Sequence, residues 1–171
     1  MKTLYPALVT ALIAIPAAGH ADEIPASIAA SGETHIVTVQ AQGAQVYECK
    51  ADAAGKLAWS FREPIATLLL DGKTVGRHYA GPNWEWADGS IVAGKVIGRA
   101  PGASANDIPL LKLAAGQHRG AGMLDGVATI QRLATKGGMP EAPCAVAGTI
   151  LSVAYSADYA FHRKTYSARQ N

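Results

Sequence analysis

The sequence predicts an all-β domain, either an antiparallel sandwich or a partly closed barrel of about eight or nine short strands. Short runs rich in β-branched and aromatic residues recur along the chain, separated at even spacing by glycine- or proline-containing turns. No strand–helix–strand alternation appears, which argues against a parallel sheet. No internal repeat or linker divides the chain, so one antiparallel domain is expected.

The first half of the domain is expected to form hairpins. The expected strands cover residues 35–40, 44–50, 57–63, 65–70 and 73–79. Leu57, Trp59 and Phe61 share one face, a clean period of two. Pro64 is expected to separate two strands, since proline donates no hydrogen bond to a ladder. Asp71-Gly72 is a hairpin-turn signal.

The second half continues in the same manner, with a turn at Asp88-Gly89 and a loop over residues 101–107. The expected strands cover residues 90–100, 108–113, 123–136 and 148–164. The third of these has an apolar spacing that would also suit a helix. Gly126 and the threonines nearby favour a strand instead.

The first 21 residues have the features of a signal peptide. Lys2 precedes an apolar run, Leu4 to Pro16, that is too short to span a bilayer, and small residues follow at positions suited to cleavage. The folded protein is therefore expected to begin near Asp22 and to act in the periplasm or as a secreted protein.

Four segments are expected: the signal peptide 1–21, a flexible leader 22–34, a single β-rich domain 35–163 and a basic tail 164–171. The whole chain has 15 basic and 13 acidic residues, a net charge of +2. Nucleic acid and anionic membranes are poor candidates for the partner of so balanced a chain. No transmembrane segment is expected after signal cleavage, so the mature chain should be soluble.

Cys49 and Cys144 are the only cysteines. In an oxidising compartment an even pair favours one disulfide. A metal pair is disfavoured because neither cysteine has a ligand nearby in sequence. A catalytic thiol would have to stay reduced, which export opposes.

The segment 77–90, RHYAGPNWEWADGS, is the densest cluster of functional side-chain types. A Gly-Pro pair bends the backbone there, so the flanking residues can converge on a pocket for a small molecule. The candidate ligand-binding residues in it are His78, Tyr79, Trp84 and Trp86. The alternative interpretation is structural: the segment plugs the end of a barrel, with aromatic residues in the core and Asp88 setting the turn.

Arg132 is the fifth candidate. Gln131 and Arg132 are adjacent on an expected strand, so they point to opposite faces and one of them is buried. A buried arginine needs an acidic partner, so a structural salt bridge is the first expectation. Anchoring of an anionic ligand is the alternative.

Four motifs occur in the same order as in a known family. They are HYAGPNWEWADGS (78–90), NDIPLLKL (106–113), GAGMLDGVATIQRLATKGGMPEAPC (120–144) and VAYSADYAFHR (153–163). The chain resembles, over roughly residues 35–163, a family of secreted bacterial and fungal proteins catalogued as domain of unknown function thirty-four fifty-five (DUF3455). The resemblance implies a secreted β-rich single domain and carries over no activity, cofactor or catalytic residue. The chain has Asn83 where the family commonly has threonine, and Leu110 where it often has an aromatic residue.

Three functions compete at this point, and none of them identifies a cofactor. The first is a non-enzymatic binding module for a small molecule, using the five candidate residues. The second is a metal-dependent enzyme in which His78 and a carboxylate, Glu85 or Asp88, hold the ion. The third is an envelope protein that meets a protein partner through loops 101–107 and 136–143.

Overall fold

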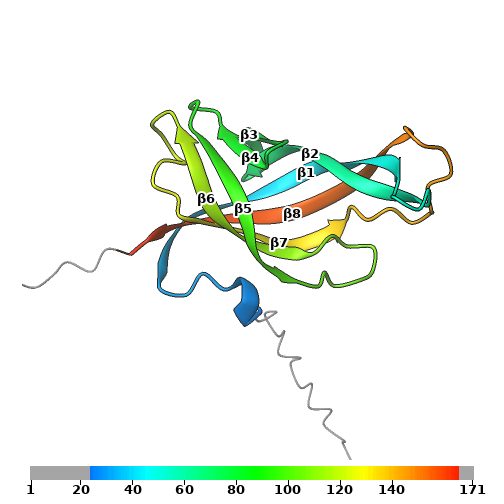
Figure 1. Cartoon of the computed structure of the whole chain (residues 1–171). Coiled ribbons are helices and arrows are strands. Elements are labelled where there is room, and N and C mark those ends of the chain that lie inside the picture. Colours follow the sequence, from blue (N-terminus) through cyan, green and yellow to red (C-terminus); the bar gives the residue numbers. More distant parts are fainter. Residues whose placement is uncertain (1–23, 166–171) are drawn as a thin grey trace, which may run out of the picture.

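The computed structural model describes residues 24–165 and confirms the all-β class (Figure 1). Its elements are η1 (Ala26–Ile28), β1 (Glu33–Ala51), β2 (Leu57–Leu70), β3 (Lys73–Tyr79), β4 (Asn83–Trp86), β5 (Ile91–Ala100), β6 (Leu110–Arg119), β7 (Thr129–Gly137) and β8 (Ile150–Lys164). The predicted signal peptide and the end of the predicted basic tail lie outside the described residues.

Every strand pairs antiparallel with the next one along the chain, and β8 returns to pair with β1. The eight strands therefore close into a ring, a barrel with simple up-and-down order. The first and last strands share a long ladder, from Glu33 opposite Lys164 to Glu48 opposite Ile150. Closure removes the free sheet edges that an open sandwich would have to protect.

Two predicted strand breaks are absent. β1 runs through Gly43, and β2 runs through Pro64. Pro64 is tolerated because β3 pairs with β2 only as far as Ala66, opposite His78. At Pro64 the strand has a ladder partner on the β1 side alone, so the missing N–H leaves no gap in a ladder to β3.

The prediction for residues 123–136 is right in its second part and wrong in its first. β7 begins only at Thr129, and the preceding residues form a turn. Gly126 has a φ of 71°, a left-handed conformation that ends any continuous strand. Leu124 and Val127 nevertheless reach the hydrophobic core from this turn. Their apolar spacing reflects core packing within a loop.

The barrel has two ends that differ in what closes them. One end lies to the right in Figure 1, and we call it the open end. It is formed by residues 52–56, 80–82, 101–109 and 138–149. We call the opposite end the sealed end. It is formed by residues 71–72, 87–90 and 120–128.

Part of the predicted leader packs on the outside of the barrel. Ile28, in η1, is fully buried, and η1 contacts β5 and β6. Two side chains hold this segment: the Gln131 amide donates to the Ile28 carbonyl (2.6 Å), and the Lys112 ammonium donates to the Ala29 carbonyl (2.7 Å). Gln131 thus points outward and is buried by the leader.

Cys49 and Cys144 form the predicted disulfide, with their Cα atoms 5.7 Å apart. The bond joins β1 to the segment 138–149, and it is consistent with a location outside the cytoplasm. Within residues 24–165 we find no helix with the length and apolar character needed to cross a membrane.

Candidate functional site

The barrel interior widens at the open end into a cavity of about 550 Å³. This volume lies within the range of pockets that bind small organic molecules, roughly 300–1,000 Å³. All eight strands contribute side chains to its wall. The cavity follows from the inward-facing positions of the barrel.

Three aromatic side chains form one wall of the cavity: His78, Trp84 and Tyr159. His78 on β3 lies opposite Trp84 on β4, so both rings face inward and stack, with centroids 4.4 Å apart and planes 13° apart. The Tyr159 ring contacts both, at 4.9 Å and 5.2 Å. A Cβ at Gly94 would lie 2.9 Å from the Trp84 ring, so the glycine leaves room for the indole.

His78 is a neutral imidazole in this wall. Its Nδ1 lies 2.8 Å from the Asn83 carbonyl, which only accepts, so Nδ1 carries the proton and Nε2 is left as an acceptor. Burial lowers the pKa of His78 from 6.5 to about 3, although the bond to Asn83 opposes the shift. At neutral pH the ring contributes polarity to the site without charge.

Arg132 supplies a positive charge to the cavity, beside Tyr159 of the aromatic wall. Its Nε and Nη2 both donate to the Pro109 carbonyl, at 3.0 Å and 2.8 Å. The predicted salt bridge is wrong: no carboxylate lies within ion-pair distance of Arg132 among residues 24–165. The reason is the register of β7, which places Leu111 and Tyr159 beside the arginine.

Three side chains of the cavity wall carry a buried polar atom with no hydrogen-bond partner among the described residues. They are Gln45 (Nε2), Trp84 (Nε1) and Tyr159 (the hydroxyl). All three side chains are at most 2 % exposed. The Tyr159 hydroxyl lies near Tyr155 and Arg132, and the Gln45 amide lies near Tyr155, so these groups can pair within the chain. The Trp84 indole N–H has no such neighbour, and leaving a buried donor unsatisfied costs roughly 1–3 kcal/mol.

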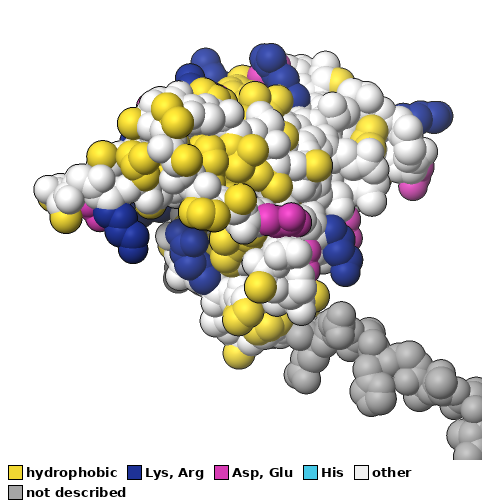
Figure 2. Space-filling view, turned by 90° about the vertical axis from the view of Figure 1, so that its right-hand side faces the viewer, with side chains coloured by type: hydrophobic (Ala, Val, Ile, Leu, Met, Phe, Trp, Pro, Cys, Tyr) yellow, Lys and Arg dark blue, Asp and Glu magenta, His cyan; other side chains and the backbone are white. Residues whose placement is uncertain are grey.

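The mouth of the cavity is more apolar and more exposed. Trp59, Phe61 and Met139 line it, and the face of the open end shows hydrophobic side chains gathered at its centre with basic and acidic side chains around them (Figure 2). The Trp59 indole donates to the Ala142 carbonyl (2.8 Å). Together with the disulfide, this bond fixes the segment 138–149 beside the mouth.

Two of the five predicted ligand-binding residues lie elsewhere. Tyr79 is on the outer face of β3, where the Arg77 guanidinium lies 5.1 Å from its ring. Trp86 points inward and is buried in the core, but it does not line the cavity. The structure thus brings His78, Trp84 and Arg132 together, and it separates them from Tyr79 and Trp86.

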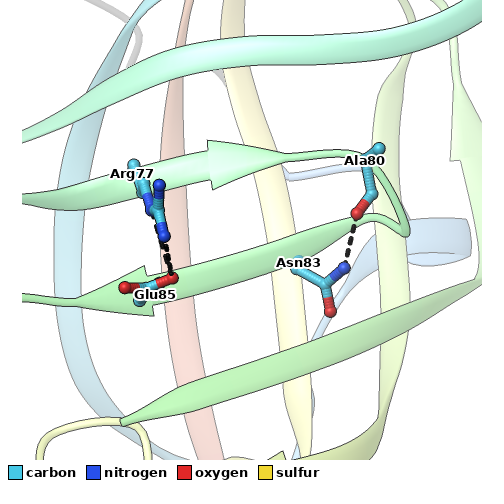
Figure 3. A network of polar contacts seen from close by, with 4 residues as sticks. All are labelled: Arg77, Ala80, Asn83 and Glu85. Atoms are coloured by element: carbon cyan, nitrogen blue, oxygen red, sulfur yellow. Dashed lines mark hydrogen bonds and ion pairs between the residues drawn. The ribbon is translucent and has the colours of Figure 1, made fainter. Parts of the chain in front are cut away.

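The proposed metal ligands do not converge. Glu85 points away from His78 and pairs with Arg77 at 2.8 Å across the β3–β4 hairpin, while Asn83 holds the turn by donating to the Ala80 carbonyl (Figure 3). Within residues 24–165 no three His, Cys, Asp or Glu side chains are grouped as a metal site.

Asp88 belongs to the sealed end, where it acts as the structural interpretation predicted. Its carboxylate accepts from the Ser90 amide (2.8 Å), the Ser90 hydroxyl (2.6 Å) and the Met123 amide (2.8 Å). The Leu124 amide then donates to the Ser90 hydroxyl at 3.2 Å. These bonds, the one from the Ser90 hydroxyl first among them, lower the pKa of Asp88.

Sequence reasoning missed several cavity residues, including Gln45, Trp59, Arg99 and Tyr159. Gln45 had a detectable signal, because at a period of two it shares a strand face with Tyr47 and Cys49, both of which are buried. The loops 101–107 and 136–143, proposed as a protein-binding surface, both lie at the open end.

A family described as "Protein of unknown function (DUF3455)" has a model that matches residues 30–163. No curated protein and no solved structure matches the chain.

Proposed function

Because the chain belongs to the DUF3455 family, whose description assigns no function, we propose from the site itself that it is a non-enzymatic binding module for a small organic molecule. The observation that carries this proposal is the cavity at the open end, with its stacked His78–Trp84 pair and the buried Trp84 indole N–H that has no hydrogen-bond partner among the described residues. Ligand sites combine such apolar walls with a few polar groups that fix orientation.

We place this module in the periplasm or outside the cell. The disulfide supports an oxidising compartment, and residues 1–21 have the features of an export signal. In this proposal export leaves a leader, 22–34, a single β-rich domain, 35–163, and the basic tail. Mass spectrometry of the exported protein should give a mature chain starting near Asp22; a chain that retains residues 1–21 would contradict export by this route.

A neutral fluorescent probe, N-phenyl-1-naphthylamine, tests the cavity directly. Val96 lines the cavity, whereas its neighbour Ile97 is 58 % exposed on the outer face of β5. We expect Val96→Phe to fill part of the cavity and to weaken probe binding about tenfold. Ile97→Phe adds a similar bulk outside and should leave binding unchanged.

Both variants are compared with the unchanged protein in thermal unfolding, so that a loss of binding is separated from a loss of folding. Trp59 and Trp84 line the cavity, and quenching of their fluorescence gives a second measure of occupancy. No binding by the unchanged protein, or equal weakening by the two substitutions, would contradict the proposed site.

A further inference from the structure

The charged side chains that line the cavity are all basic. Its lining contains three arginines, Arg62, Arg99 and Arg132, and no aspartate or glutamate. Arg62 is partly neutralised by Glu63, 3.2 Å away, but Arg99 and Arg132 have no ion-pair partner among residues 24–165. His78 adds no charge at neutral pH. A cavity of this kind attracts anions and disfavours cations.

The Arg132 guanidinium has N–H groups beyond those that bond to Pro109. Arg132 uses Nε and one side of Nη2 to hold the Pro109 carbonyl. A guanidinium has five N–H groups in a planar fork, so the Nη1 and Nη2 edge retains two parallel donors. Two parallel N–H groups match the two oxygens of a carboxylate.

The positive charge of Arg132 affects the pKa of Tyr159 in the aromatic wall. Burial raises the pKa of Tyr159, and the positive charge of Arg132 acts against the rise. The same charge also acts to lower the pKa of Tyr47 and Tyr155, so three phenols lie near the guanidinium. The phenol and indole groups of the wall are donors, which suits an acceptor ligand.

The remainder of the wall is apolar. Trp84, Val96, Leu111 and Leu113 line the cavity around the polar groups, and Trp59 and Phe61 line its mouth. These side chains can cover an uncharged ring system of a ligand whose charged end meets Arg132. The arrangement therefore separates a charged end from an apolar body.

We propose that the cavity binds a small organic carboxylate with an aromatic or similarly apolar body, its carboxylate held by the Nη1 and Nη2 edge of Arg132. This inference deepens the proposed function and rests on it. It selects monoanionic ligands over neutral and cationic molecules of the same shape.

Two probes of matched shape test the charge preference: naphthalene-1-carboxylate and naphthalene-1-carboxamide. We expect the unchanged protein to bind the carboxylate about tenfold more tightly at low salt, since hydrogen bonds to charged groups are the stronger kind. Binding is measured by calorimetry and by quenching of tryptophan fluorescence. The preference should shrink as salt is raised.

Arg132→Gln should remove the preference by weakening carboxylate binding alone, with carboxamide binding unchanged. Arg132→Lys restores the charge without the fork and should recover part of it. Arg119→Gln is the matched control, because Arg119 is exposed at the end of β6 and does not line the cavity. Because Arg132 also holds the loop at Pro109, each variant is first compared in thermal unfolding.

The outcomes separate the two proposals. If both probes bind the unchanged protein equally and Val96→Phe weakens both, the cavity is a binding site and the carboxylate inference is wrong. If Arg119→Gln acts as strongly as Arg132→Gln, net charge explains the preference and the assignment to Arg132 is wrong. If neither probe binds, the proposed function fails together with the inference.

Discussion

The two ends of the barrel treat their polar groups in opposite ways. At the sealed end, Asp88 and Ser90 exchange hydrogen bonds with each other and with the backbone of the 120–128 turn, and Leu124 is buried beneath them. At the open end, Arg132 has no carboxylate partner among the described residues, and the buried Trp84 indole N–H has no hydrogen-bond partner there.

This difference separates structure from function within one small domain. Buried polar groups are normally satisfied, and unsatisfied ones cluster where a protein meets something else. The sealed end supplies stability through a closed network. The open end has a cavity in which the Trp84 indole N–H is buried and has no hydrogen-bond partner among the described residues.

The largest expected effect comes from the disulfide, which ties the open end together. In the chain-entropy model a closed loop of 95 residues stabilises the fold by about 4–5 kcal/mol. Urea unfolding of the Cys49→Ser, Cys144→Ser double variant should show a loss of this order, and probe binding should weaken because the segment 138–149 is released from β1. A reductant should destabilise the unchanged protein and leave the double variant unaffected; equal stability of the two proteins would contradict this.

A core truncation at the sealed end should have a somewhat smaller effect on stability and none on binding. Leu124 is fully buried, so Leu124→Ala should cost about 3 kcal/mol in urea unfolding. Its neighbour Met123 is 39 % exposed, and Met123→Ala should change stability by less than about 0.5 kcal/mol. Probe affinity of the folded Leu124→Ala protein should equal that of the unchanged one. A weakened affinity would show that the two ends are coupled.

Stability should also depend on pH, in different pH ranges at the two ends of the barrel. Because the folded-state pKa of His78 is lowered from 6.5 to about 3, the unfolded chain binds this proton first on acidification. The stability that neutral His78 contributes is complete above pH 6.5 and is lost as pH falls toward 3. His78→Gln should flatten the stability curve across that range, measured by urea unfolding at a series of pH values. A remaining slope is expected from His162, whose pKa burial also lowers.

Asp88 should act only at lower pH. Hydrogen bonds from Ser90 and Met123 hold its pKa below 3.8, so its contribution is present above that value and disappears as pH falls below it. In the same unfolding series, Asp88→Asn should be less stable than the unchanged protein at neutral pH, and the two should converge in acid. Convergence already near pH 6 would assign the network to another group.

Alternating strands make the all-β class predictable, with a partly closed barrel as one of two architectures, and the single cysteine pair of an exported chain makes the disulfide predictable. Strand lengths are not predictable in this way. Pro64 lies inside β2, and the sequence does not show that the ladder to β3 ends before Pro64. The turn at 120–128 was partly mistaken for a strand, since Leu124 and Val127 fill the core from a loop and leave the same apolar spacing.

Strand alternation also makes part of the candidate site predictable. His78 and Trp84 pair across a short hairpin, so the sequence places them together, and alternation places Tyr79 on the other face. Arg132, in contrast, meets them only because β7 and β8 complete the ring. Whether a carboxylate stands beside that arginine depends on register between distant strands, and the sequence contains no local signal for it.

The up-and-down order also determines the orientation of any tethered form of the protein. β8 begins at the open end with Ile150 and finishes opposite Glu33, at the far end of the barrel. A surface or a fusion partner attached after Lys164 would therefore leave the mouth of the cavity facing the surrounding medium. Immobilisation through that side is the natural geometry for screening compound collections against the intact domain.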